Sequence, residues 1–390
     1  MSSKDKPYKV YRGGRTKGPI KPIPKESPRR DPKPAHDGDG YDGAYAPAPK
    51  KRRRWGRKVA ALLLLVIVLA IVWGILGFLA FRSGVKDANA RLDPKAHAAL
   101  APQNGSLLSN PTNVLLLGAD VGSKSRAGSG NGRSDSIMLI HTDPDDHRLA
   151  LLSIPRDLRV TIPGRGEDKV NAAYSLGGPA LAIKAVTNLT GLPVNHVMVV
   201  DFKSFGEVVD AIGGVTINVK KPILSKFECP YETAERCASW KGYSFRKGTH
   251  EMNGSRALIY ARIRKNELNP GESDFSRAER QQQVVQAIAD KAVGFWGYLH
   301  MPFVGNDLVK PLATDLSAWE FAQLGWVKFR APSSQTLKCH LGGTPSSLGG
   351  ASVILGSEDN PEIISMVTGE IAAQPPAPGN PFNPGCFVGG

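Results

Sequence analysis

The sequence predicts an α/β (α+β) sandwich in which a mixed central sheet is flanked by helices, preceded by a disordered tail and one transmembrane helix. Two observations predict the sandwich. Apolar runs of strand length alternate with helical segments along the second half of the chain, which is typical of α/β architecture. The first three apolar runs read as strands that run up, down and up, so they form an antiparallel meander and make the sheet a mixed one.

Residues 1–58 form a basic tail. Residues 1–50 are rich in proline, glycine, lysine and arginine and hold few aliphatic side chains, a composition that predicts disorder. A net charge of +15 is typical of nucleic-acid-binding proteins, but residues 1–58, with 18 Lys and Arg against 6 Asp and Glu, hold +12 of it. The excess charge belongs to the tail and not to a folded binding face, so we expect no nucleic-acid partner.

A membrane anchor follows the tail. Residues 59–81 are 23 residues without a charge, about 34 Å as a helix, which is enough to cross a bilayer. The preceding charged region is too long for a cleaved signal peptide, as is the apolar run itself, and no small-residue cleavage site follows. The cationic cluster at 50–58 predicts a cytoplasmic N-terminus in the cell membrane, with the rest of the chain extracytoplasmic.

The four cysteines fit an oxidising compartment. Sequence alone permits three connectivities, of which Cys229–Cys237 and Cys339–Cys386 form the natural pairing. No C-x-x-C motif or histidine at ligand spacing accompanies them, so we expect disulfides and not a metal site.

Beyond the span we expect a linker at 82–112, one folded domain at 113–372 with its motifs in 113–291, and a Pro/Gly-rich tail at 373–390. Strands are predicted at 113–120, 136–142, 149–154, 196–202 and 213–219, and helices at 179–189 and 203–211. The sequence contains no G-x-S-x-G, P-loop or H-E-x-x-H motif, so the usual support for hydrolases and nucleoside triphosphatases is missing.

Charged residues gather at one edge of the predicted meander. The end of the first strand, the start of the second and the end of the third share that edge. The residues at these positions are Asp120, Arg133, Asp135, Arg156 and Asp157. Two nearby carboxylates need a cation between them, so Asp120 and Asp135 suit Mg²⁺ or another divalent cation. Either Asp157 or Asp274 could accept a proton from an attacking hydroxyl.

A second group of cations lies at 257–283. The segment 257–264 is predicted as a strand that carries Arg262 and Arg264 on one face. Ser276 and Glu279 form a capping-box signature, which predicts a helix from Arg277. The first turn of that helix presents one polar face, made by Arg277, Arg280 and Gln281. Paired guanidinium groups favour phosphate binding, with surface salt bridges as the competing interpretation.

Several motifs in order carry a family resemblance. GAD, RSD, SIPRD, KVNAAYSLGG, the GGV turn, HEMNGSRALIYARIR and DFSRAERQQ resemble the LytR-CpsA-Psr (LCP) family over residues 113–291. The resemblance implies a membrane-anchored extracytoplasmic phosphotransferase. Such an enzyme moves an anionic glycopolymer from a polyprenyl-pyrophosphate carrier to a peptidoglycan hydroxyl and forms a phosphodiester. The resemblance also implies an apolar tunnel for the polyprenyl chain.

The resemblance assigns roles to individual residues. Asp120 and Asp135 would hold the metal and, with Arg156, Arg262, Arg264 and Asp274, make up the catalytic set. The pyrophosphate-binding set would comprise Arg156, Arg262, Arg264, Arg277 and Gln281, with contributions from Arg133, Lys169, Asp274 and Arg280. The long glycine-rich loop before Arg133 and the two-cysteine insert at 227–240 depart from the family's usual pattern.

Two alternatives remain open at this stage. The chain could be a non-catalytic wall-glycan-binding or regulatory protein, although a pure binder has no need of paired acids. It could also hydrolyse the polyprenyl pyrophosphate at the same site, with water as the acceptor.

Overall fold

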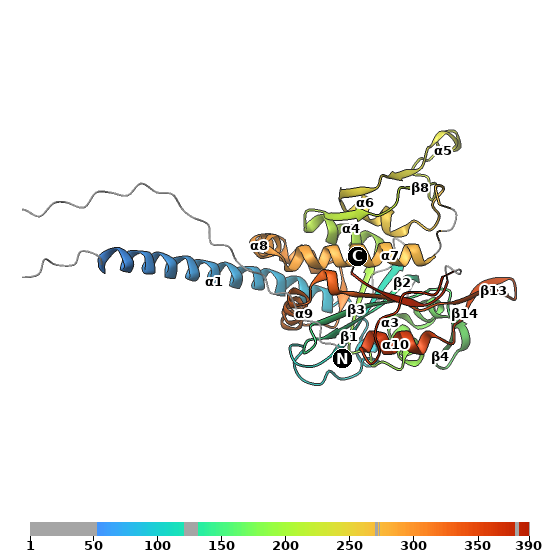
Figure 1. The fold of residues 1–390 in the computed structure, drawn as a ribbon, viewed down its shortest axis with the longest axis horizontal. Coiled ribbons are helices and arrows are strands. Elements are labelled where there is room, and N and C mark those ends of the chain that lie inside the picture. Colours follow the sequence, from blue (N-terminus) through green and yellow to red (C-terminus); the bar gives the residue numbers. More distant parts are fainter. Residues whose placement is uncertain (1–52, 121–131, 270–271, 273, 379–381, 390) are drawn as a thin grey trace, which may run out of the picture. The chain divides into compact units, whose positions relative to one another are not determined.

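A mixed seven-stranded sheet lies at the centre of the computed structural model, with the strand order β11-β6-β1-β2-β3-β12-β15 (Figure 1). The structure describes residues 53–120, 132–269, 272, 274–378 and 382–389, and the side chains of Arg53, Arg54, Asp120, Arg133 and Asp274 are not among the described parts. The strands of the sheet are β1 (Thr112–Asp120), β2 (Arg133–Asp143), β3 (Arg148–Ile154), β6 (His196–Asp201), β11 (Ala313–Thr314), β12 (Leu337–His340) and β15 (Gly385–Val388).

Strand pairing confirms the predicted meander and the mixed sheet. β2 is antiparallel to both β1 and β3, and Asp120 lies opposite Arg133 in the register. β6 runs parallel to β1, and β12 runs parallel to β3. Smaller two-stranded sheets surround the centre: β4 (Arg159–Ile162) with β5 (Gly166–Lys169), β7 (Val215–Val219) with β10 (Gly248–Met252), β8 (Ile223–Ser225) with β9 (Tyr243–Phe245), and β13 (Gly343–Leu348) with β14 (Ala351–Gly356).

Helices cover both faces of the central sheet. The helices of the described residues are α1 (Arg53–Asn89), α2 (Pro94–His97), α3 (Val170–Thr190), α4 (Phe202–Ala211), α5 (Ala234–Ser239), α6 (Gly254–Arg262), α7 (Asp274–Val293), α8 (Phe295–Val309), α9 (Ala318–Arg330) and α10 (Asn360–Thr368), of which α5 lies in the insert away from the sheet. Side chains alternate across a strand. Leu115 and Leu117 of β1 accordingly pack in one core with α3, whereas Val114 and Leu116 face a cavity on the side of α7.

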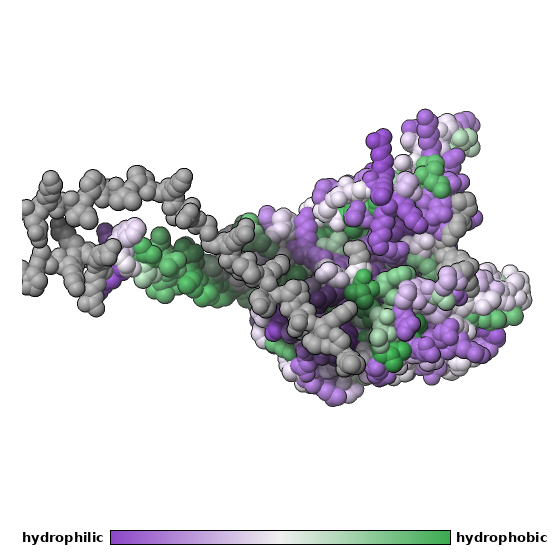
Figure 2. All heavy atoms as spheres, viewed as in Figure 1, coloured by the Kyte–Doolittle hydropathy of each residue, from purple (hydrophilic) through white to green (hydrophobic). Residues whose placement is uncertain are grey.

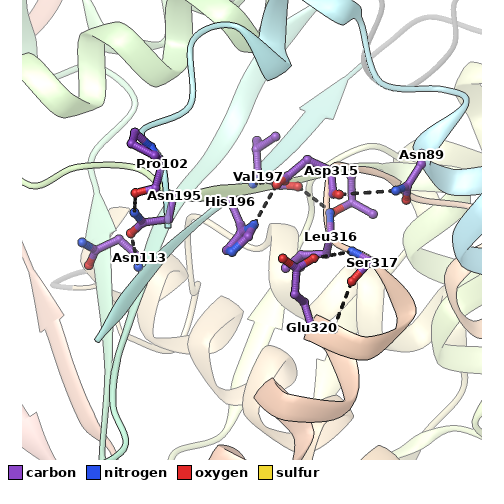
Figure 3. Close-up of polar contacts among 11 residues, drawn as sticks. Asn89, Pro102, Asn113, Asn195, His196, Val197, Asp315, Leu316, Ser317 and Glu320 are labelled. Carbon is purple, nitrogen blue, oxygen red and sulfur yellow. Dashed lines mark hydrogen bonds and ion pairs between the residues drawn. The ribbon is translucent and has the colours of Figure 1, made fainter. Parts of the chain in front are cut away.

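Asp315 joins the end of α1 to the central sheet, and the cap of α9 follows it in the chain (Figure 3). Asp315 accepts a hydrogen bond from the backbone N–H of Val197 at 2.7 Å, and its other oxygen lies 2.7 Å from Nδ1 of His196. The backbone carbonyl of Asp315 accepts a bond from Asn89 at the end of α1. Two residues on, Ser317 and Glu320 cap α9 reciprocally. The three elements therefore meet at one polar cluster, in which Nε2 of His196 and Oδ1 of Asn89 are buried without a hydrogen-bond partner.

The prediction of a strand at 257–264 is wrong, because residues 257–262 belong to α6 and the helix ends before residue 264. Asn253 caps this helix by accepting the N–H of Arg256 at 3.0 Å. Buried Ala257, Tyr260 and Ala261 follow helical spacing, and that period prevails over the apparent alternation. Arg262 is the last helical residue, so it does not share a strand face with Arg264.

Two helices start earlier than predicted, and one strand was not predicted. α3 starts at Val170, well before the predicted residue 179, and bends at Gly177 and Gly178, where φ of Gly178 is +63°. α7 starts at Asp274 and not at Arg277. Residues 385–388, expected to be tail, form the edge strand β15, which pairs with β12.

Both expected disulfides are present. Cys229–Cys237 closes the insert that carries α5, and Cys339–Cys386 joins β12 to β15. The second bridge spans a sequence separation of 47, against 8 for the first. A bridge that closes a longer loop restricts the unfolded chain more.

We therefore expect the paired Cys339→Ser and Cys386→Ser substitution to lower the free energy of unfolding by about 3 kcal/mol. The paired Cys229→Ser and Cys237→Ser variant is the control, because its bridge lies in an exposed insert and its effect on global unfolding should be smaller. Thermal unfolding of the full-length protein, followed by circular dichroism, measures both. Equal losses in the two variants would contradict the assignment of β15 to the core sheet.

Candidate active site

Charged side chains converge where β2 begins and β3 ends. An Nη1 of Arg156 contacts Oδ1 of Asp135, and Nε of Arg156 lies 3.3 Å from Asp157. Lys169, at the end of β5, lies 3.1 Å from the other oxygen of Asp157. The predicted convergence of loops far apart in the sequence is therefore present in the described residues. Asp157 is paired with two cations, so its role is to hold Arg156 and Lys169 in place.

The first turns of α7 pack over the ends of β2 and β3 and form one wall of the site. Arg277 and Gln281 line a small pocket of about 20 Å³ together with Asp135 and Ser136. Ser136 donates to Oε1 of Gln281 at 3.0 Å, which fixes the amide. Arg277 is only 6% exposed, so α7 delivers a buried guanidinium to the pocket and not a solvated tip.

Arg280 points away from this pocket into a structural ion pair. Its Nη1 lies 2.7 Å from Glu272, and its Nη2 donates to the carbonyl of Ile263 at 2.7 Å. The side chains of Arg280 and Glu272 are 6% and 9% exposed. A buried guanidinium with these two partners holds the segment after α6 against α7. The phosphate-binding role of Arg280 stays a prediction, and the contacts show a structural role for the side chain.

Arg262 and Arg264 separate at the end of α6. Arg262 pairs with Glu228 of the disulfide-closed insert at 2.5 Å and lies over the ring of Phe202, 4.2 Å from its centroid. The preceding carbonyl, of Ala261, accepts from Gln281 at 3.4 Å, so Arg262 lies at the rim of the site. Arg264 is exposed beyond the helix.

His340 and Phe275 also line the pocket, and the sequence did not indicate them. Their rings lie 4.4 Å apart between centroids, and His340 Nε2 is 3.0 Å from the carbonyl of Asn383. Burial lowers the pKa of His340 below its usual value, so the ring is kept neutral. His340 sits on β12, outside every recognised motif, and no spacing signal could have found it.

Three predicted site residues have side chains outside the described parts: Asp120, Arg133 and Asp274. Their backbones are placed at the end of β1, the start of β2 and the start of α7. Within the described residues no group of three His, Cys, Asp or Glu could hold a metal. A Mg²⁺ site would need only one or two carboxylates, and Asp135 offers an oxygen donor beside the Ser136 hydroxyl.

An apolar cavity of about 690 Å³ lies further along α7. Its floor is the sheet face that carries Val114, Leu116 and Ile140, and its roof includes Val285 and Ile288 of α7. Helices α1, α8 and α9 supply further lining residues. An apolar cavity was expected from the resemblance, and the structure contains one.

Comparisons with known proteins agree with this architecture. A model of the LytR_cpsA_psr family matches residues 78–362. Regulatory protein MsrR of Staphylococcus aureus (strain COL) is 34% identical over 232 residues, 58% of this chain and 63% of that protein. The match thus spans less than two thirds of MsrR. Polyisoprenyl-teichoic acid--peptidoglycan teichoic acid transferase TagU of Bacillus anthracis (strain CDC 684 / NRRL 3495) is 33% identical over 263 residues, 64% of this chain and 79% of TagU.

Solved structures show the same fold. The crystal structure of B. subtilis TagV is 26% identical with a TM-score of 0.56, over 68% of this chain and 99% of that one. TagT bound to LI-WTA is 25% identical with a TM-score of 0.52, over 68% of this chain and 92% of that one.

The ion pair of Arg280 gives a first test of the site. We expect Glu272→Gln to lower the free energy of unfolding by about 3 kcal/mol, because it leaves a buried guanidinium without its counter-charge. The control is Glu279→Gln, which removes the exposed pair with Lys220 and should cost less than about 1 kcal/mol. Urea denaturation measures both. A loss in Glu272→Gln no larger than in the control would refute the structural role of Arg280.

The buried histidine gives a second test. Because the folded pKa of His340 is lowered, the unfolded chain takes up a proton below about pH 6.5 that the folded chain does not. Stability therefore falls as the pH drops through that range, and His340→Gln should flatten the fall by up to about 1.4 kcal/mol per pH unit. Unfolding midpoints from pH 7.5 to 5 measure this slope. The matched control is His97→Gln, which replaces an exposed histidine, and its slope is compared with that of His340→Gln.

Proposed function

This chain belongs to the LytR-CpsA-Psr family, and we propose that it is a membrane-anchored phosphotransferase. In this proposal it transfers an anionic glycopolymer from a polyprenyl-pyrophosphate carrier to a hydroxyl of peptidoglycan on the extracytoplasmic side. A family match over residues 78–362 supports the proposal, as does the likeness to TagU, which is named a teichoic acid transferase.

One observation carries the proposal: α7 connects a cationic pocket to an apolar cavity. Arg277 and Gln281 lie in the pocket, and Val285 and Ile288 line the cavity two turns further along the same helix. At 1.5 Å per residue, Arg277 and Val285 are about 12 Å apart along the axis. A molecule with an anionic head and a long apolar tail matches this arrangement, and a polyprenyl pyrophosphate is such a molecule.

The pyrophosphate would be held by Arg156 and Arg277, with Lys169, Gln281 and Arg262 close by. Arginine suits this task because its planar donors match phosphate oxygens in pairs. Magnesium, held by Asp120 and Asp135, would neutralise further charge on the transferring group. Phosphoryl transfer depends mainly on such positioning and charge stabilisation.

The proposed step is a single displacement at the phosphorus that bears the glycan. The oxygen of the peptidoglycan hydroxyl forms a bond to this phosphorus, and the bridging P–O bond breaks, so that polyprenyl phosphate leaves. The hydroxyl proton passes to an ionised carboxylate, which acts as the general base. Both oxygens of Asp157 are already engaged by Arg156 and Lys169, so we assign this role to Asp274 at the start of α7.

The regulatory and hydrolytic alternatives differ from this proposal in their products. A binding or regulatory protein would release no polyprenyl phosphate. A hydrolase would release it equally well without any glycan acceptor. A transferase requires the acceptor for full turnover, so one assay separates the three.

We expect full-length protein in lipid nanodiscs, with magnesium, to release polyprenyl phosphate from a lipid-linked anionic glycan when peptidoglycan fragments are present. Arg277→Ala and Asp135→Asn should each reduce the rate by at least about 100-fold, because each removes charge stabilisation at the transferring phosphate. Arg246→Ala, an exposed arginine between β9 and β10, should retain the rate.

Metal binding is measured separately, by electron paramagnetic resonance of added Mn²⁺. Asp135→Asn should bind it more weakly than the unchanged protein. An unchanged rate in Arg277→Ala would overturn the transferase assignment. Release of polyprenyl phosphate at the same rate with and without peptidoglycan fragments would also overturn it.

A further inference from the structure

Helix α8 is unusually apolar for a helix outside the predicted membrane span. Its sequence, FWGYLHMPFVGNDLV, contains one charged residue, Asp307. Phe295 and Phe303 are 78% and 71% exposed, and Tyr298 and Leu299 are each 44% exposed. Water is a poor environment for a continuous surface of this kind.

This helix packs against α1 inside the apolar run of residues 59–81. The hydroxyl of Tyr298 donates to the carbonyl of Ala70 at 2.5 Å, and Trp73 Nε1 donates to the carbonyl of Leu299 at 3.1 Å. The rings of Trp73 and Phe303 meet edge to face at 5.6 Å. Ala70 lies 11 residues before Phe81, which is about 16 Å along the helix axis.

Glycines allow the two helices to approach closely. A Cβ on Gly84 would lie 2.3 Å from the carbonyl oxygen of Asn306, and one on Gly77 would lie 3.0 Å from Cβ of Met301. A Cβ on Gly305 would lie 3.0 Å from the backbone nitrogen of Phe81. Small residues at helix contacts are how helices associate within lipid. The contact therefore holds α8 at the level of the outer end of the span.

Helix α9 lies against α1 as well and also presents exposed aromatic side chains. The rings of Phe321 and Phe81 meet edge to face at 5.5 Å. Trp319, Trp326 and Phe329 are 63%, 54% and 64% exposed. Tryptophan is typical of the boundary between lipid and water, and the exposed phenylalanine adds to the apolar surface beside it.

The mouth of the apolar cavity opens between these helices. Gly74 and Phe78 of α1 line the cavity and belong to the apolar run. Trp326 and Phe329 line it too and are more than half exposed, so they mark its opening. Figure 2 shows the apolar surface of α1 (green) reaching the folded part of the chain, where α8 and α9 lie in Figure 1.

We propose that α8 and the exposed face of α9 are seated in the lipid bilayer beside α1, so that the cavity opens onto acyl chains and not onto water. The bilayer is the occupant because the apolar surface is continuous with the transmembrane helix and reaches residues within its span. The Asp315 cluster fixes the end of α1 to the sheet, so this seating also sets the position of the cavity relative to the bilayer (Figure 3).

The seating has a consequence that rests on the proposed function. A polyprenyl chain would move sideways from the bilayer into the cavity without crossing water, while its pyrophosphate reached the pocket at the far end of α7. Exposing a chain of this kind to water would cost about 0.8 kcal/mol for each CH₂ group.

Spin labels test the seating without any assay of activity. All cysteines in the described residues are in disulfides, so labels attach at the introduced cysteines of Phe303→Cys, Trp319→Cys and the control Leu348→Cys. Leu348 is 40% exposed at the end of β13. In nanodiscs, the first two labels should be more accessible to oxygen than to a water-soluble nickel chelate, and the control label should show the reverse. Nickel access at all three positions, or dipolar coupling between copies at position 303, would overturn the proposal.

A functional comparison uses residues that do not line the cavity. Phe295→Glu combined with Phe303→Glu should reduce turnover of a full-length carrier in the bilayer by about tenfold or more. Turnover of a short-chain, water-soluble carrier should stay unchanged, and Leu348→Glu should affect neither. Equal loss on both carriers would indicate damage to the site and contradict the proposal. Failure of the proposed function would abolish both rates in the unchanged protein and leave the spin-label result intact.

Discussion

The hydrogen bonds of Asp315 tie the end of α1 to the central sheet and so fix its position relative to the proposed active site. A buried carboxylate is costly unless it is paired, and this one takes the N–H of Val197 and the ring of His196 at the start of β6. Because β6 is parallel to β1, the residues that bear the charged site emerge at the opposite end of the sheet. The nine residues of β1 separate the two ends by roughly 27 Å. The length of β1 therefore fixes the distance between the charged residues of the site and the end of α1.

Helix α7 runs between these two ends, and a buried glutamine in it is hydrogen-bonded to the central sheet. Gln282 is buried, and its amide nitrogen lies 3.1 Å from the carbonyl of Leu151 and 2.9 Å from that of Cys339. These bonds tie α7 to β3 and β12 while leaving Val285 free to face the cavity. The glutamine run is thus the part of α7 that crosses from a charged pocket to an apolar one, where uncharged donors cost less to bury than arginines.

Local patterns predicted the sheet well and the arginines less well. Strand runs and short turns were enough to place Asp135 and Arg156 together, since turn length decides which strand ends meet. The pattern of 257–264 fits both a strand period and a helical period. The cap at Asn253, which lies before this segment, is the local signal that favours a helix. The partner of Arg280 is Glu272, which lies outside the capping pattern that drew attention to the helix. His340 and the cavity depend on packing between distant elements, which no local spacing encodes.

The arginines near the site differ in how deeply their ion pairs are buried. This difference decides which of them could exchange its carboxylate partner for a phosphate. Arg280 and Glu272 are both nearly inaccessible, so separating them would leave two charges unpaired in the interior. Glu228, the partner of Arg262, is 60% exposed, and water can solvate it once the arginine turns to another anion. An incoming pyrophosphate can thus replace Glu228 at little cost. In the proposed reaction Arg262, which pairs with Glu228 of the disulfide-closed insert, is therefore a ligand at the rim that can exchange its partner. Arg280 instead keeps its buried partners and holds α7 in position.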